Sequence, residues 1–276
     1  MKLSARMRAA LYTLLALVLF VWIFPIYWAL ATSLKPSGDI RSATPTLFPH
    51  QFVMEHYRSV LGGSEFFTFL QNSLVVAIGV VLLTLLLSCC SAFALSRLRF
   101  PGSNLVGILI LLVYLFPGIL LVIPLFKMMA AAGLYNNLLS LIFIHVVLTL
   151  PFATWTLRDF FNAIPGDIAD AARVDGASNM QILRNVYLPL SAPGIAVAAI
   201  FSFVVSWNDY IFASVMLSDR ELLTLPLGLV AWTSSYSIDW GSVTAASILT
   251  VVPAFVFFAF LGRLFIRGMT AGATKG

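Results

Sequence analysis

The sequence predicts an all-α membrane protein with six transmembrane helices and both termini in the cytoplasm. Hydrophobic residues make up 61% of the 276-residue chain and charged residues 10%, whereas a soluble domain carries about 25% charged residues. Six apolar runs are long enough to cross a bilayer as helices, because about 20 residues span its hydrocarbon core. These runs cover residues 9–31, 70–95, 105–126, 138–157, 190–217 and 242–265.

The distribution of basic residues predicts how the chain is oriented. An even number of spans places both termini on one side, where 11 Lys and Arg residues fall against 5 on the other. Cytoplasmic loops of membrane proteins carry the excess of Lys and Arg. We expect a single membrane domain over residues 1–276, with a cytoplasmic loop at 158–189 and external segments at 32–69 and 218–241. Basic residues in cytoplasmic loops explain the net charge of +5, which therefore does not indicate a nucleic-acid partner.

The first span and the external segment after it each allow two interpretations. The run 9–31 ends near Ala29-Leu30-Ala31, which resembles a signal-peptidase site, but its apolar stretch is longer than that of a signal peptide. This length favours a retained membrane helix over a cleaved signal. In the segment 32–69, His50 and His56 have no carboxylate or thiolate support nearby, which favours solvated loop histidines over a metal site.

The third and fourth spans contain residues that are unusual in a bilayer. Pro117, Gly118 and Pro124 must interrupt backbone hydrogen bonds, which is tolerated only where protein or a water-filled cavity satisfies the freed groups. A bent helix beside a solute pathway and a kink used for packing both fit this pattern. In the fourth span, His145 fits either a proton relay or a hydrogen bond to a neighbouring helix. No intramembrane carboxylate lies near it in sequence, which favours the hydrogen bond.

The fifth span carries a polar and aromatic cluster. A carboxylate inside a bilayer is costly unless it faces protein or water, so Asp209 is a candidate pathway residue. Its neighbours have aromatic and amide groups of the kind that stack on and hydrogen-bond to a sugar ring. A position at the outer membrane interface, where Trp and Tyr collect, is the alternative. The candidate pathway residues are Trp207, Asn208, Asp209, Tyr210 and Pro117.

The segment Ile164–Pro189 is polar in an otherwise apolar chain, and its pattern predicts two short helices. Pro165 fits a first helical turn and Gly176 supplies a helix stop. A second helix begins at Ser178 or Asn179 as N-cap and ends at Pro189. Its apolar face consists of Met180, Leu183, Val186 and Tyr187, and its polar face of Gln181, Arg184 and Asn185.

A short amphipathic helix between membrane spans cannot bury its apolar face alone. It is therefore suited to a groove on a soluble partner. The order Asp170-Ala171-Ala172, three residues, Gly176, nine residues, Val186, one residue, Leu188-Pro189 resembles the signature cytoplasmic loop of ABC importer permeases. That family usually has Glu at the first of these positions and Ile in place of Val186. Both differences keep the chemistry of the side chain.

This resemblance implies that the loop carries the coupling helix that docks on an ATPase subunit. The implied coupling residues are Asp170, Ala171, Ala172, Gly176, Met180, Leu183, Arg184, Val186, Tyr187, Leu188 and Pro189. Other short segments are similar to carbohydrate permeases of the maltose-permease type, and this narrower resemblance runs over essentially the whole chain. They are Ser33-Leu34-Lys35-Pro36, Asn72-Ser73-Leu74, Phe100-Pro101-Gly102, Trp207-Asn208-Asp209 and the glycine-rich tail 267–276.

The resemblance implies a type I ABC importer permease fold and a set of partners. These are a second permease subunit forming a heterodimer, two ATPase subunits, an extracytoplasmic solute-binding protein, a sugar-like substrate and the inner membrane of a prokaryote. The chain has no GxxxxGK motif followed by Ser or Thr, so ATP and Mg are expected on the ATPase partner and no cofactor on this chain.

Two other classes of protein fit the sequence less well. An ion-coupled secondary transporter is expected to carry several polar groups near the bilayer midplane, and only Asp209 and His145 are candidates. An intramembrane enzyme needs a catalytic set, and the chain contains no GxSxG, no HExxH and no paired intramembrane acids.

Overall fold

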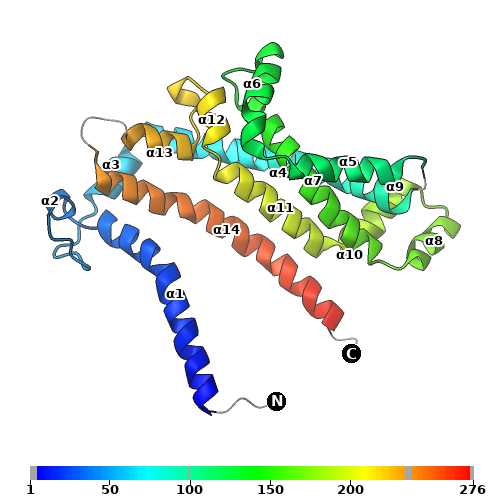
Figure 1. Cartoon of the computed structure of the whole chain (residues 1–276), viewed down its shortest axis with the longest axis horizontal. Coiled ribbons are helices and arrows are strands. Elements are labelled where there is room, and N and C mark those ends of the chain that lie inside the picture. The colour runs from blue at the N-terminus through cyan, green and yellow to red at the C-terminus, as the bar shows by residue number, and fades with distance from the viewer. Residues whose placement is uncertain (1–4, 99, 234–237, 274–276) are drawn as a thin grey trace. The chain divides into compact units, whose positions relative to one another are not determined.

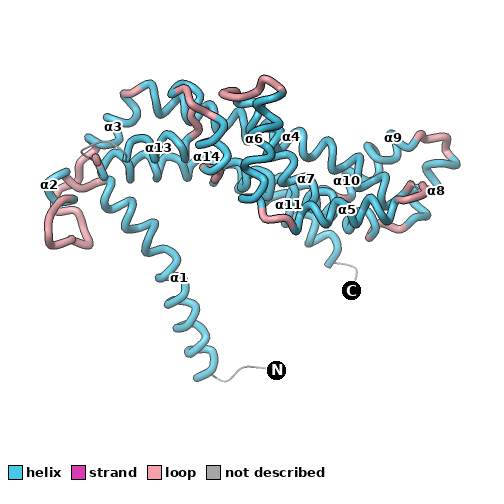
Figure 2. The backbone as a smooth tube through the Cα atoms, turned by 45° about the horizontal axis from the view of Figure 1, so that its top comes forward, coloured by secondary structure: helices cyan, strands magenta, loops and turns pink. Residues whose placement is uncertain are grey.

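The computed structural model describes residues 5–98, 100–233 and 238–273, with helices throughout and no strand in these ranges (Figures 1 and 2). The chain divides into two compact units: Met1–Phe67 with Leu229–Val252, and Thr68–Gly228 with Pro253–Gly276. Residues 274–276 of the glycine-rich tail and residues 234–237 of the predicted external segment 218–241 lie outside the described residues. So do Lys2, Arg99 and Lys275, which belong to the basic residues on the predicted cytoplasmic side.

Four of the six predicted spans are continuous helices. They are α1 (Ala5–Ser33), α4 (Ser64–Arg97), α7 (Leu138–Asn162) and α14 (Trp240–Ala273), and each contains a stretch long and apolar enough to cross a bilayer. The 34 residues of α4 correspond to about 51 Å at 1.5 Å per residue, which exceeds a hydrocarbon core of about 30 Å. The predicted third and fifth spans are different, because each is broken.

The predicted third span is interrupted at Pro117. Helix α5 (Ser103–Leu115) ends there, and a 3₁₀ turn, η1 (Gly118–Leu121), leads into α6 (Val122–Ala131), at 95° to α5. The break follows from proline chemistry, since Pro117 donates no hydrogen bond and holds the preceding residue in an extended conformation. The prediction that Pro124 also interrupts the helix is wrong, because Pro124 lies in the first turn of α6, where its amide is not needed.

The predicted fifth span, 190–217, consists of two helices separated by a short break. Helix α11 (Ala192–Trp207) has 16 residues, or about 24 Å, and follows the preceding helical segment at a bend of 83°. The shorter α12 (Ile211–Met216) comes after the break. The described residues therefore contain four continuous apolar helices, or up to six spans if each bent pair counts as one.

Other short helices lie in the predicted external segments. Helices α2 (Ser37–Ile40) and α3 (Glu55–Gly62) belong to 32–69, and η3 (Arg220–Leu222) and α13 (Leu225–Thr233) to 218–241.

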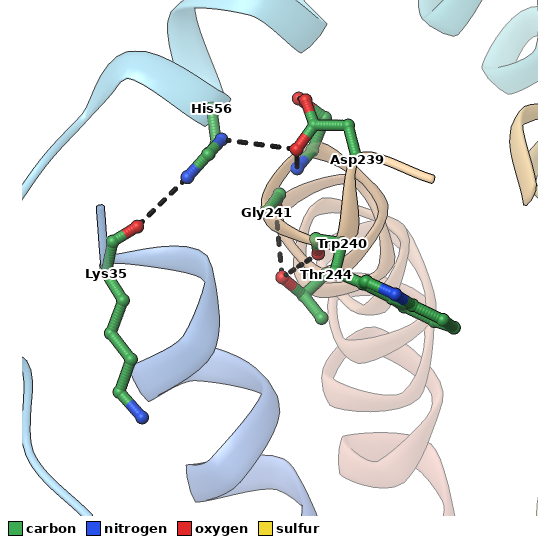
Figure 3. A network of polar contacts seen from close by, with 7 residues as sticks. Lys35, His56, Asp239, Trp240, Gly241 and Thr244 are labelled. Carbon is green, nitrogen blue, oxygen red and sulfur yellow. Dashed lines mark hydrogen bonds and ion pairs between the residues drawn. The ribbon is translucent and has the colours of Figure 1, made fainter. Parts of the chain in front are cut away.

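A polar network in the first unit surrounds His56 on α3 (Figure 3). The ring is only 3% exposed, with Nε2 3.0 Å from the carbonyl oxygen of Lys35 and Nδ1 3.7 Å from Oδ1 of Asp239. Gly241 lies against the imidazole so closely that a Cβ there would overlap it. The expectation of a solvated His56 is therefore wrong, because the start of α14 packs over the ring. His50 is exposed, as expected.

The core of the second unit is built on close packing between α7 and α11. Gly194 of α11 is buried against the ring of Phe160 on α7, and the rings of Phe152 and Phe201 lie 4.1 Å apart between centroids. A small residue lets two helix backbones approach closely, and this close packing favours helix association inside a membrane.

We predict that Gly194→Ala destabilises the protein by about 1–3 kcal/mol, the usual cost of overpacking. The added Cβ would lie 2.6 Å from Cγ of Phe160, so the ring must move. Thermal unfolding of the purified protein in detergent measures the effect. Gly262→Ala is the matched control, because nothing lies within 4 Å of a Cβ at that position. Equal melting temperatures for the two variants would contradict the proposed packing.

Candidate functional site

The polar loop after α7 folds as two short helices, as predicted. The first, α8 (Gly166–Val174), begins directly after Pro165. The helix is stopped by Gly176, two residues after its last residue, whose φ of +84° is a left-handed conformation that favours glycine. The amide of Ala177 donates a hydrogen bond to the carbonyl oxygen of Ala172 at 3.0 Å, the long bond of a Schellman motif. The predicted role of Gly176 as a helix stop is confirmed.

The second helix begins with a reciprocal cap. Ser178 is the N-cap of α9 (Asn179–Ile182), and its Oγ accepts a hydrogen bond from the amide of Gln181 at 3.4 Å. In return, the amide of Ser178 donates to Oε1 of Gln181 at 2.7 Å. This capping box selects Ser178 over Asn179 as the start of the helix. The side chain of Gln181, which was predicted only to lie on the polar face, is therefore engaged in this cap.

The helix continues past Pro189, although Pro189 was predicted to end it. A π-helical segment, η2 (Leu183–Tyr187), leads into α10 (Leu188–Leu190), and the amide of Leu188 donates to the carbonyl oxygen of Leu183. A proline disturbs the carbonyl four residues before it. The wider π turn upstream of Pro189 takes up this disturbance, so the helix runs to Leu190 before the bend into α11.

The predicted apolar face of the second helix is divided between two environments. Leu183 is 4% exposed and Tyr187 is completely buried, while Val186 is half-buried. Met180 is 65% exposed. The expectation that all four side chains face a partner therefore changes: Leu183 and Tyr187 attach the loop to its own chain, and Met180 alone of the four faces fully outward.

Tyr187 is the centre of this attachment. Its ring makes edge contacts with Phe93 of α4 and Phe161 of α7, each with 5.3 Å between centroids. The guanidinium of Arg97, at the end of α4, lies 5.1 Å from the centroid of the Tyr187 ring. Arg97 also donates hydrogen bonds to the carbonyl oxygens of Phe161 and Ile164, the latter at 2.6 Å. One cation thus holds together the ends of two long helices and the polar loop.

The outward surface of the loop combines exposed apolar side chains with an ion pair. Val174 is 88% exposed, and Ile168 and Met180 are exposed as well. Beside them, Nη1 of Arg173 lies 2.6 Å from Oδ1 of Asp170. We call Ile168, Asp170, Arg173, Val174 and Met180 the loop surface. Val174 was not among the predicted coupling residues, although a lone valine in a polar stretch was a usable signal.

A cleft of about 1090 Å³ lies next to the loop surface, between the turn after α4 and helix α8. Polar and charged side chains contribute much of its wall, which is unusual for a pocket that holds an apolar ligand. These side chains are Ser96, Arg97, Ser103, Asp170, Arg173 and Asn179.

The candidate pathway residues do not form one cluster of free side chains. Trp207 is buried and stacks on Phe203, with 5.1 Å between ring centroids and 16° between planes. Asn208 is exposed, but its Nδ2 donates to the carbonyl oxygen of Val204 at 2.9 Å. Tyr210 and Pro117 are both exposed. Of the five candidate pathway residues, Asn208, Tyr210 and Pro117 are therefore the exposed ones.

Asp209 has a structural role at the break between α11 and α12. Its carboxylate accepts hydrogen bonds from the amides of Phe212 and Ala213, at 3.1 and 2.9 Å. It also lies 3.3 Å from Nε2 of His145, which is buried on α7. The other imidazole nitrogen of His145 lies 3.2 Å from Oγ of Ser206.

The predicted hydrogen bond between His145 and a neighbouring helix is therefore present, since Ser206 belongs to α11. The carboxylate partner was missed because it lies far away in sequence. The pair connects α7 to the start of α12.

The chain belongs to a family of permease subunits. Residues 84–270 match the family described as the binding-protein-dependent transport system inner membrane component. The chain is 39% identical to the inner membrane ABC transporter permease protein YcjP of Escherichia coli, over 98% of this chain and 97% of that protein. It is 36% identical to the diacetylchitobiose uptake system permease protein DasC of Streptomyces coelicolor, over 95% of each chain. It is 34% identical to the trehalose transport system permease protein SugB of Mycobacterium tuberculosis, over 98% of each.

A solved structure has the same fold. The chain aligns with a TM-score of 0.84 and 23% identity to a chain of a bacterial ABC transporter involved in the import of the acidic polysaccharide alginate. The alignment covers 96% of this chain and 99% of that chain. The predicted ABC importer permease fold is therefore confirmed, and the protein is a membrane permease subunit of a binding-protein-dependent importer.

We predict that Tyr187→Ala destabilises the protein and that Tyr187→Phe does not. The alanine variant leaves a cavity between Phe93 and Phe161 and is expected to lose about 3–5 kcal/mol. The Tyr187 hydroxyl is buried without a hydrogen-bond partner among the described residues, so its removal in Tyr187→Phe is expected to leave stability unchanged or higher. Thermal unfolding in detergent distinguishes the two, and a destabilised phenylalanine variant would show that the hydroxyl has a partner.

Proposed function

We propose that this chain is one of two permease subunits of an ATP-driven importer for a sugar or sugar-like solute. The observation that carries this proposal is similarity over nearly the full chain to permeases named for trehalose and diacetylchitobiose uptake. The exposed amide of Asn208 and the exposed ring of Tyr210, which are groups that bind sugars, support it. In this role the chain performs no catalysis, and ATP with Mg is held by the ATPase partners.

The proposed topology has six spans in the inner membrane of a prokaryote, with both termini and the loop 158–189 in the cytoplasm. It is supported by the excess of basic residues on that side and by the family's inner-membrane description. In this topology the third span is α5 followed by α6, and the fifth span is α11 followed by α12, so each of the two is a broken span. A non-helical backbone at membrane depth must be surrounded by protein or line a water-filled cavity. The breaks at Pro117 and at 208–210 therefore mark the proposed pathway.

The proposed assembly contains this chain, a second permease, two ATPase subunits and an external solute-binding protein. The loop surface docks on one ATPase subunit, where Ile168, Val174 and Met180 supply apolar area and the Asp170–Arg173 pair supplies charge. ATP binding closes the ATPase dimer, and the docked loop moves with it. Because Arg97 and Tyr187 attach the loop to α4 and α7, this movement reaches the spans.

Alternating access follows from this arrangement. The spans rock so that the cavity opens outward to the binding protein, and ATP hydrolysis resets them. Along the pathway, Asn208 and Tyr210 contact the solute. Trp207 and Asp209 keep these residues in position, because Trp207 stacks on Phe203 and Asp209 accepts a hydrogen bond from the start of α12.

Purification of the tagged chain from its native membrane tests the assembly. We expect an ATPase, a second permease and a binding protein to co-purify, and the reconstituted complex to accumulate at least one of trehalose, maltose and diacetylchitobiose when ATP is supplied inside. Recovery of the chain alone, with uptake driven by an ion gradient without ATP, would replace the proposal with a secondary transporter.

We predict that Gly176→Val leaves membrane insertion intact but uncouples ATP hydrolysis from sugar uptake. Valine is strained at a φ of +84°, so the connection between α8 and α9 changes and the loop surface is no longer continuous. The measurements are ATPase activity and sugar uptake in proteoliposomes. Gly166→Val is the control, because Gly166 has an ordinary φ and nothing within 4 Å of a Cβ. Normal uptake by Gly176→Val would contradict the docking of this loop.

A further inference from the structure

The first unit contains a cavity of about 470 Å³. This volume lies within the range of about 300–1,000 Å³ that is typical of small-molecule sites. Its wall is formed by the end of α3, the start of α4, the end of α13 and the start of α14. The segments that form it belong to the proposed external side, and none of the candidate pathway residues contributes to it.

An indole forms the aromatic part of the wall. Trp232 on α13 is half-buried, and its Nε1 donates a hydrogen bond to Oε2 of Glu65 at 3.1 Å. Glu65 stands in the first turn of α4, so the bond fixes the indole against the start of a long helix. An aromatic ring held in one orientation is a suitable platform for the C–H face of a sugar ring. Val60 and Phe66 add buried apolar surface beside it.

Hydroxyl and carboxylate groups line the rest of the cavity. Ser59, Ser64 and Ser242 supply hydroxyls that donate and accept hydrogen bonds, and Asp239 supplies a second carboxylate. A carboxylate accepts hydrogen bonds from sugar hydroxyls more strongly than a neutral acceptor does. An aromatic platform with such groups around it is the chemistry that binds a polyhydroxylated ring.

The carboxylates of this cavity already have partners, which argues against a cationic ligand. Asp239 accepts hydrogen bonds from Oγ and the amide of Ser242, at 2.6 and 3.2 Å, and faces His56 (Figure 3). Burial raises the pKa of Asp239, but the bonds from Ser242 and the charge of His56 together lower it below its ordinary value. The carboxylate is therefore ionised at neutral pH, and Glu65 is engaged by the indole.

From this lining we infer that the cavity is a binding site for one sugar ring, which receives the solute on the external side before it enters the pathway. The inference rests on the proposed function, because it assigns a second contact site to the same solute. The groups that select the sugar at this site are the indole of Trp232 and the hydrogen-bond acceptors Glu65 and Asp239. The contacts of His56 with Lys35 and Asp239 keep α3 and α14 in place around it.

The test is sugar uptake by the complete reconstituted complex with its binding protein, using the member of the panel trehalose, maltose and diacetylchitobiose that the wild type accumulates. We expect Trp232→Ala to raise the half-saturating concentration of that sugar about tenfold, the effect of losing one aromatic contact. Trp232→Phe keeps a ring and is expected to give a smaller increase. ATPase activity stimulated by the sugar-free binding protein is expected to stay unchanged in both.

The control is Trp240→Ala, since Trp240 is exposed at the start of α14 and lies outside the cavity wall. The melting temperature of each complex shows whether its variant is folded. If the Trp232→Ala complex is misfolded, Trp232→Phe, which keeps a ring in the cavity, is compared with the wild type instead. Unchanged half-saturation in Trp232→Ala would overturn the sugar site while leaving the importer intact. Loss of ATPase stimulation by the sugar-free binding protein would also overturn it, because the cavity would then hold part of that protein. A wild-type complex that accumulates no sugar would overturn the proposed function itself.

Discussion

The contact between Arg97 and the end of α7 is the constraint on which the polar loop after α7 depends. Helix C-termini leave carbonyl groups without partners, and a cation satisfies them with favourable charge. Arg97 does this for Phe161 and Ile164 and also lies over the Tyr187 ring, so a single side chain from α4 fixes the end of α7 and the loop that follows. In the proposed assembly, this rigid anchor is what lets a movement of the docked loop reach the spans.

Three prolines of the second unit affect their helices in different ways. Pro117 breaks its span because the residue before it is forced into an extended conformation. Pro124 does not break α6, because it lies in the first helical turn, where a backbone N–H has no partner within the helix. Pro189 has an intermediate effect, since the π turn before it absorbs the disturbance. The same residue type thus ends, starts or widens a helix according to its position in the local hydrogen-bond pattern.

The features that could be predicted from sequence are those decided by near neighbours. The stop at Gly176 and the cap at Ser178 depend on a few adjacent residues, and the apolar runs by themselves indicate the membrane helices. The inward position of Tyr187 depends on Phe93 and Phe161, which come from two other helices, and could not be predicted. The burial of His56 beneath Gly241 was hidden for the same reason: its neighbours are distant in sequence.

The buried pair of His145 and Asp209 has an evolutionary consequence. Removing one member of a buried polar contact leaves the other group without its partner and costs about 1–3 kcal/mol, whereas replacing both with apolar side chains of the same shape is often nearly neutral. In the second unit this pair also fixes the start of α12, through the amides of Phe212 and Ala213. A descendant of this chain that loses the histidine first would therefore pass through a poorly folded intermediate. The two positions are expected to diverge together across lineages, with the helix start rebuilt by another cap.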